Sequence, residues 1–151
     1  MNFEGIFRVM LLAVLPVSEI RGALPYGVFA ERLPLPVTFG VAFLGNVLPF
    51  FLVMYLIPCV FSLFQRMQWF RRFWSWYTER AKNRFVPYRR YGKWGIFFFI
   101  GIPLPFTGVW TGSLVAFLAG FRTWEIFPFV LGGIALAGSI VTLFVLFGRG
   151  I

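Results

Sequence analysis

A carboxylate and a guanidinium two residues apart, Glu19 and Arg21, are the side chains best suited to chemistry in this chain. Both lie in an otherwise apolar stretch that follows Pro16. In a bilayer such groups cost about 3 kcal/mol each on insertion scales, so they usually face a cavity, a partner or a substrate. We therefore expect Glu19 to take up a proton or a cation, and Arg21 to hold an anionic head group. If the stretch instead lies at the membrane surface, both charges cost little there.

Four polar residues could complete such a site with hydroxyl groups, an indole and backbone donors: Ser18, Thr107, Trp110 and Thr111. The chain contains no His and one cysteine, Cys59. This composition excludes His-based catalysis, His metal sites and cysteine zinc clusters. We therefore expect no enzymatic activity, no metal and no cofactor.

The composition is that of a membrane protein. Of the 151 residues, 60% are apolar and 13% are charged, whereas a soluble domain is about a quarter charged. Three uncharged stretches, 33–65, 94–121 and 126–148, are each longer than the roughly 20 residues that a spanning helix needs. We predict one integral membrane domain over residues 1–151.

Two stretches rich in proline and glycine, 16–27 and 101–112, interrupt the apolar sequence. Their break-forming residues are Pro16, Gly22, Pro25, Gly27, Pro103, Pro105, Gly108 and Gly112. Each break precedes a short apolar piece and then a long apolar segment, at 36–64 and 126–148. Unwound backbone is tolerated in a bilayer only where protein or water covers it.

This layout predicts an all-α integral membrane fold built from two inverted repeats, at 3–64 and 94–151. Each repeat would be a re-entrant helical hairpin, broken by Pro and Gly, followed by a long spanning helix. The alternative is four ordinary spanning helices, two of them kinked by proline. In the first long segment Asn46 could bond to backbone freed at a kink, although we expect it to serve packing.

The basic residues are concentrated between the repeats. From Arg66 to Lys93 there are nine Lys and Arg residues and one acid. A helix over 65–82 would have one basic and one aromatic face, which predicts an amphipathic connector, 65–93, in the headgroup layer. Short loops rich in Lys and Arg stay in the cytoplasm, so we place 66–93 there, against anionic lipid headgroups. We expect no nucleic-acid partner, because these charges flank membrane segments.

The residues of the two breaks resemble the small multidrug export protein family. The matching residues are Pro16, Glu19, Arg21, Gly22, Ala23, Pro25 and Gly27, then Gly45 and Asn46, then Pro103, Leu104, Pro105, Thr107, Gly108, Trp110, Thr111 and Gly112. That family in turn looks like a compact relative of the DedA/SNARE-associated (VTT-domain) membrane proteins. By position, Glu19 and Arg21 would be the acidic and basic members of the first hairpin motif. Where the second DedA hairpin usually supplies an Arg, this chain has Thr107 and Gly108.

The resemblance implies facing re-entrant hairpins in a multi-pass protein of the cell (inner) membrane. Its function would be that of a transporter or lipid translocase, with a small-molecule or lipid substrate between the hairpins. Two alternatives stay open: a drug exporter, as the family name suggests, and a structural or assembly protein that acts through the basic aromatic loop. A homo-oligomer is compatible with each.

Overall fold

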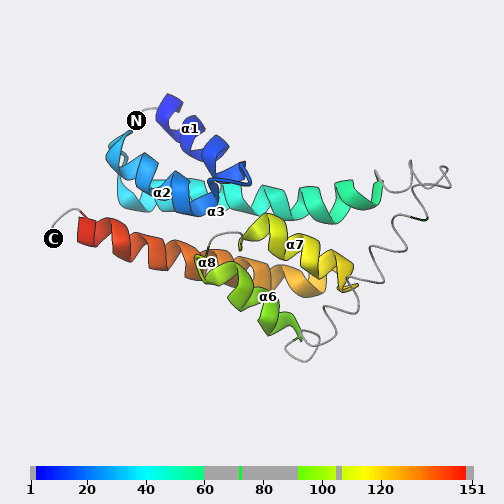
Figure 1. The fold of residues 1–151 in the computed structure, drawn as a ribbon. Coiled ribbons are helices and arrows are strands. Elements are labelled where there is room, and N and C mark those ends of the chain that lie inside the picture. Colours follow the sequence, from blue (N-terminus) through cyan, green and yellow to red (C-terminus); the bar gives the residue numbers. More distant parts are fainter. Residues whose placement is uncertain (1–2, 60–71, 73–91, 105–106, 149–151) are drawn as a thin grey trace.

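A computed structural model describes residues 3–59, 72, 92–104 and 107–148. Within these ranges the chain is helical and contains no strand, as predicted. The elements are α1 (Phe3–Val14), α2 (Glu19–Phe29), α3 (Leu35–Phe51), the π-helix η1 (Leu52–Leu56), α6 (Gly92–Gly101), α7 (Val109–Leu118) and α8 (Thr123–Gly148) (Figure 1). The predicted helix at 65–82, most of the connector and Pro105 lie outside the described residues.

Two helices of the described part are long and apolar enough to cross a membrane. The first runs from Leu35 to Cys59 through α3 and η1, and the second is α8. They run in opposite directions along the bundle and pack against each other (Figure 1). Their lengths of 25 and 26 residues exceed the roughly 20 that the hydrocarbon core requires.

The four remaining helices form two short hairpins. Helices α1 and α2 pack together against α3, while α6 and α7 pack together and α6 lies along α8. These arms have 10 to 12 residues, so each is about 15–18 Å long, roughly half the thickness of the hydrocarbon core. The two turns meet near the middle of the bundle, and the open ends of the hairpins point to opposite ends of it (Figure 1).

The two halves interlock through their second arms. Helix α2 packs against α8, and α7 packs against α3 and η1. One hydrophobic cluster accordingly contains residues from every helix. The halves therefore share one core, and neither hairpin is a separate packing unit.

Both breaks are shorter than the proline and glycine pattern suggests. The first turn occupies residues 15–18, and the described ends of the second are 102–104 and 107–108, whereas Gly22, Pro25 and Gly27 lie inside α2, and Gly112 lies inside α7. These residues were expected to belong to the breaks. The glycines instead serve packing: Thr38 and Val9 occupy the space of a side chain at Gly27, and Ile100 occupies that space at Gly112. Tight contact with neighbouring helices holds α2 helical despite its internal proline.

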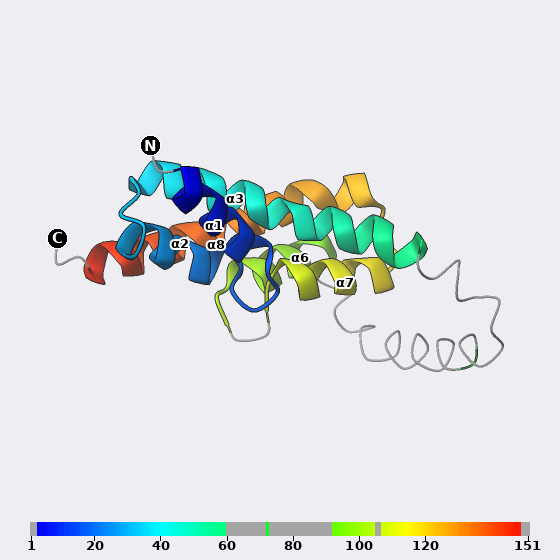
Figure 2. The same cartoon turned by 90° about the horizontal axis from the view of Figure 1, so that it is seen from above.

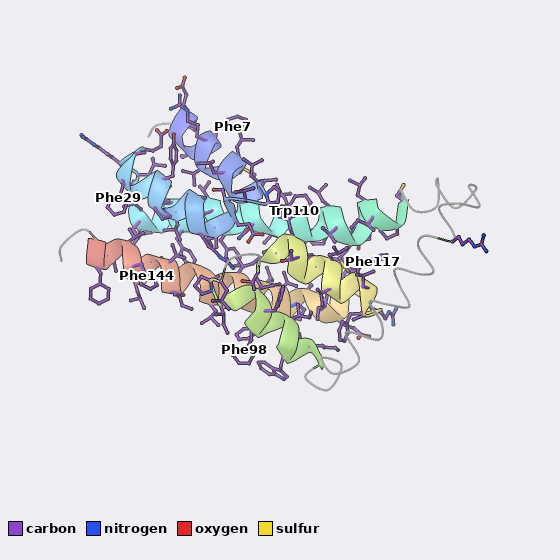
Figure 3. The ribbon with its side chains drawn as sticks, viewed as in Figure 1. Phe7, Phe29, Phe98, Trp110, Phe117 and Phe144 are labelled. Atoms are coloured by element: carbon purple, nitrogen blue, oxygen red, sulfur yellow. The ribbon has the colours of Figure 1, made fainter. Side chains whose placement is uncertain are left out.

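The surface of the bundle is apolar. Phe7, Phe29, Phe98 and Phe144 point outward from four different helices (Figure 3), and all four are at least 49% exposed. An apolar exterior of this kind suits contact with lipid rather than water.

Candidate functional site

Glu19 is the first residue of α2 and reaches across to the second hairpin. Its backbone has a left-handed φ of 46°, which is rare for a residue with a side chain, and only 6% of its surface is exposed. Carboxylate Oε1 accepts a hydrogen bond from the backbone N–H of Trp110 at 3.4 Å. Because free N–H groups and a partial positive charge mark the start of a helix, Glu19 neutralises the N-terminus of α7.

Gly108 makes this approach feasible. It precedes α7 with a φ of 154°, and a Cβ built on it would overlap the Glu19 carboxylate. Only glycine both adopts this backbone conformation readily and leaves the space that the contact requires. Glu19 and Gly108 therefore fit each other across the two hairpins.

Arg21 binds the other side of the second break. Its guanidinium donates to the carbonyl oxygens of Leu104 and of Ile102, the latter at 3.4 Å, and to Thr107 Oγ1 at 2.9 Å. These acceptors follow the C-terminus of α6, where unpaired carbonyls leave a partial negative charge. The Arg21 Nε atom is buried and has no partner within the described residues.

Glu19 and Arg21 thus bind opposite sides of the second break and do not bind each other. Glu19 lies at the start of α7, and Arg21 lies at the end of α6, so each charge meets the helix terminus of opposite sign. No salt bridge joins the two side chains in the described part of the chain. We call these contacts the clasp; it consists of Glu19, Arg21, Thr107, Gly108 and Trp110.

Thr107 and Trp110 tie the clasp to the surrounding backbone. Thr107 Oγ1 accepts from the Leu104 N–H at 3.2 Å and lies within 2.9 Å of the carbonyls of residues 102 and 104. The Trp110 indole N–H donates to Val14 O at 2.8 Å, at the last residue of α1. Trp110 lies between the two halves at the centre of the bundle (Figure 3).

The other residues expected at the site lie beside the clasp. Ser18 packs over Gly22 within its own hairpin, and Thr111 is exposed one residue beyond Trp110. Pro16 is in the first turn and Pro103 in the second. Of the six expected binding residues, the structure therefore brings together Glu19, Arg21, Thr107 and Trp110.

Asn46 was expected to serve packing, with a bond to freed backbone as the alternative, and the structure shows the bond. Asn46 is fully buried in α3. With the amide oriented to suit its neighbours, its nitrogen donates to Ala13 O at 3.0 Å and its oxygen accepts from the Ile20 N–H at 3.2 Å. Asn46 thus joins the end of α1 to the start of α2. The available signal was a polar amide in the middle of an apolar span, because such a group must find partners when buried.

A small apolar cavity adjoins the clasp between η1 and α7. Its volume is about 240 Å³, and it is lined by Leu52, Val53, Leu56, Ile57, Trp110, Thr111 and Leu114. A π-helical turn widens a helix locally and often occurs at functional sites. Within the described residues, no group of three or more His, Cys, Asp or Glu side chains could hold a metal ion.

A family model described as "Putative small multi-drug export protein" matches residues 19–140. The chain belongs to this family. The matched region begins at Glu19 and contains all the residues of the clasp. Neither curated proteins nor solved structures gave a match to the chain. Family membership and two long apolar helices are the features of a membrane protein.

Proposed function

We propose that this protein is a small membrane transporter that moves its substrate, a small amphiphilic molecule or a lipid, through a site between two facing re-entrant hairpins. The observation that carries this proposal is the clasp, in which a buried carboxylate and a guanidinium meet the broken ends of two helices. Ionisable groups held at membrane depth, beside helix termini, are typical of transport sites.

The arrangement of the helices supports an inverted repeat. Gly45 of α3 accommodates Met10 and Ala13 of α1, and Gly133 of α8 accommodates Phe97 and Ile100 of α6 in the same way. The two long helices are antiparallel, so the two repeats, each of which contains one of them, would enter the bilayer from opposite sides (Figure 1). The shared hairpin plan also favours kinship with the DedA/SNARE-associated proteins.

In this proposal transport proceeds by exchange of partners in the clasp. A proton or a cation on Glu19 releases the N–H of Trp110, and an anionic head group on Arg21 replaces the carbonyls of Ile102 and Leu104. The hairpins can then separate on one side of the membrane while they remain packed on the other. The cavity between η1 and α7 would take an apolar part of the substrate.

Orientation follows from the basic connector. We propose that residues 66–93 lie in the cytoplasm, against anionic lipid, and that the protein is a multi-pass protein of the inner membrane. A cysteine at Ser75, in a chain with Cys59 replaced, should react with an impermeant maleimide only from the cytoplasmic side. Reaction from outside would show that the protein has the opposite orientation.

Flux through proteoliposomes tests the site. We expect Glu19→Gln and Arg21→Ala each to lower transport of a lipophilic cationic dye or a fluorescent anionic lipid at least tenfold, at normal insertion. The matched control is a second acid–base pair, Lys93 and Glu125, whose atoms lie 3.3 Å apart outside the breaks. Glu125→Gln and Lys93→Gln should retain flux. Full flux in both clasp variants would refute the assignment of Glu19 and Arg21 to the transport site.

A structural or assembly role is the second candidate, because the basic residues are so concentrated at 66–93. Deletion of residues 66–90 separates the two functions. A transporter of the proposed kind should keep measurable flux after the deletion if it still inserts. Loss of function with an intact clasp would favour the assembly role.

A further inference from the structure

Trp110, the second residue of α7, contacts three parts of the molecule. Its main-chain N–H donates to Glu19 Oε1 at 3.4 Å, and its indole N–H donates to Val14 O at 2.8 Å. Its side of α7 also forms part of the wall of the cavity between η1 and α7. Figure 2 shows the first turn, which follows Val14, beside the start of α7. One residue therefore connects the cavity, the clasp and the first hairpin.

The indole bond is the firmer of the two bonds that Trp110 makes with the first half. N–H···O bonds in proteins span about 2.7–3.2 Å, which includes the bond to Val14 O, whereas the bond to Glu19 is longer. Val14 is the last residue of α1, where carbonyl groups lack a partner within the helix. A carbonyl that loses its partner away from water is costly. The bond to Val14 therefore fixes the position of the indole while the clasp is closed.

The cavity lies between the two halves, so its size depends on whether they are together. Four of its lining residues, 52, 53, 56 and 57, belong to the first long helix, and the other three, 110, 111 and 114, belong to α7. Its volume is about 240 Å³, and an apolar cavity of about 150 Å³ already holds benzene. A butyl chain therefore fits the closed cavity, whereas a dodecyl chain exceeds it. The larger chain fits only if α7 moves away from the first long helix.

We propose that Trp110 couples the cavity to the clasp, so that the size of a substrate's apolar group decides whether the clasp opens. In the closed state the indole is bound to Val14 O and forms a fixed wall of the cavity. When α7 moves, the indole leaves Val14, the main-chain N–H of Trp110 leaves Glu19, and the cavity widens. An apolar group too large for the closed cavity favours the open state, whereas a group that fits both states equally shifts neither.

This coupling narrows the substrate class. The protein would move amphiphiles whose apolar group exceeds the closed cavity, and it would leave small ions with the same head group untransported. Trp110 acts through Glu19, so it is a positioning residue rather than the group that binds the charged head. The inference rests on the proposed transport function and adds to it a selection by size.

Flux through proteoliposomes tests the selection. The probes are the butyl and dodecyl members of two series, alkyltrimethylammonium ions and alkylsulfonates, below the concentrations at which they form micelles. Their permanent charges slow passage through lipid, and the two series cover both signs of head group. In the parent protein we expect the maximal flux of the dodecyl probe to exceed that of the butyl probe at least tenfold. Trp110→Phe keeps a ring and the main-chain N–H but lacks the indole donor, so this ratio should fall to near one.

Trp124→Phe is the matched control. Trp124 is 70% exposed in α8, and its ring contacts Phe51 and Phe127 rather than the clasp. W124F should keep the ratio of the parent protein. Loss of flux by the same factor for both chain lengths in W110F would overturn the inference, because Trp110 would then serve stability alone. A parent protein that moves both chain lengths equally would overturn it as well.

Fluorescence reports the coupling without transport. In a chain in which the other tryptophans are replaced by phenylalanine, the dodecyl probe should shift the emission of Trp110 to shorter wavelength, because the indole loses its bond to Val14 O. The butyl probe should leave the emission unchanged. An equal response to both probes, or a response to neither, would overturn the coupling even at normal flux. A size-dependent emission without flux of any probe would refute the transport function and leave the coupling intact.

Discussion

Both hairpins turn in the middle of the bundle, but different side chains hold the two turns in place. The first turn is closed from within its own half, since Asn46 of α3 bonds to both Ala13 and Ile20. In the second half Gly133 takes the place of Gly45, and the residue after it, Ile134, is buried and apolar. The second turn is held by Thr107 within its own half and also by Glu19 and Arg21, which come from the other half.

This difference indicates where the molecule can move. A neutral amide on a long helix holds α1 and α2 together without any exchange of protons or ions. The clasp holds the two halves together through charged groups, which a proton, a cation or an anion can displace. We therefore expect the first hairpin to stay closed while the halves separate at the second turn.

The largest effect should follow from Gly108→Ala, which places a methyl group in the space of the Glu19 carboxylate. Overpacking of this kind typically costs about 1–3 kcal/mol, in addition to the backbone strain. Gly120→Ala is the control, because Gly120 also has a positive φ, of 77°, but has nothing within 4 Å of an added Cβ. Thermal unfolding in detergent measures the difference. Equal destabilisation of the two variants would show that strain alone matters and that the clasp is not a tight fit.

Asn46→Leu should have the next largest effect, about 1–3 kcal/mol of unfolding free energy, because it leaves buried backbone groups of Ala13 and Ile20 without partners. Thr38→Val is the matched control. Thr38 is also fully buried in α3, but among the described residues its hydroxyl bonds only to Pro34 O, within one turn of its own helix. Chemical denaturation of the two variants checks the order. If T38V is the more destabilised, Asn46 does not hold the first hairpin.

The smallest effects should come from the ion pairs at the open ends of the hairpins. Glu31, whose side chain is 8% exposed, accepts from Arg8 at 3.1 Å and from the Tyr26 hydroxyl at 2.9 Å. Its counterpart Glu125 pairs only with Lys93 in the described part of the chain, and that pair is partly exposed. We expect Glu31→Gln to cost about 1 kcal/mol and Glu125→Gln less than that. Melting curves at low and high salt should show the larger loss of stability for Glu31→Gln. A larger loss for Glu125→Gln would show that the ion pair of the first hairpin is not the stronger one.

The general layout of the molecule could be predicted from the sequence. Long uncharged stretches and two clusters of proline and glycine indicate two apolar helices and two breaks, and the isolated charges Glu19 and Arg21 indicate a site at one break. These signals are local patterns of composition along the chain, and the bilayer makes such patterns unusually informative.

The partners of the site residues could not be predicted. Both charges were expected in one unwound break at 16–27, but Glu19 begins a helix and contacts a glycine 89 positions away in the sequence. The limits of the breaks were also missed, because tertiary contacts keep Pro25 and Gly27 within α2. Such outcomes depend on which helices pack together, and local propensity does not contain that information.

The fit between Glu19 and Gly108 also bears on how two similar halves can share one chain. The space between the turns holds one carboxylate and no additional side-chain carbon. A change that adds bulk at position 108 is therefore tolerable only together with a shorter side chain at position 19. Among relatives, these two positions should therefore vary as a pair, with added bulk at one matched by a shorter side chain at the other.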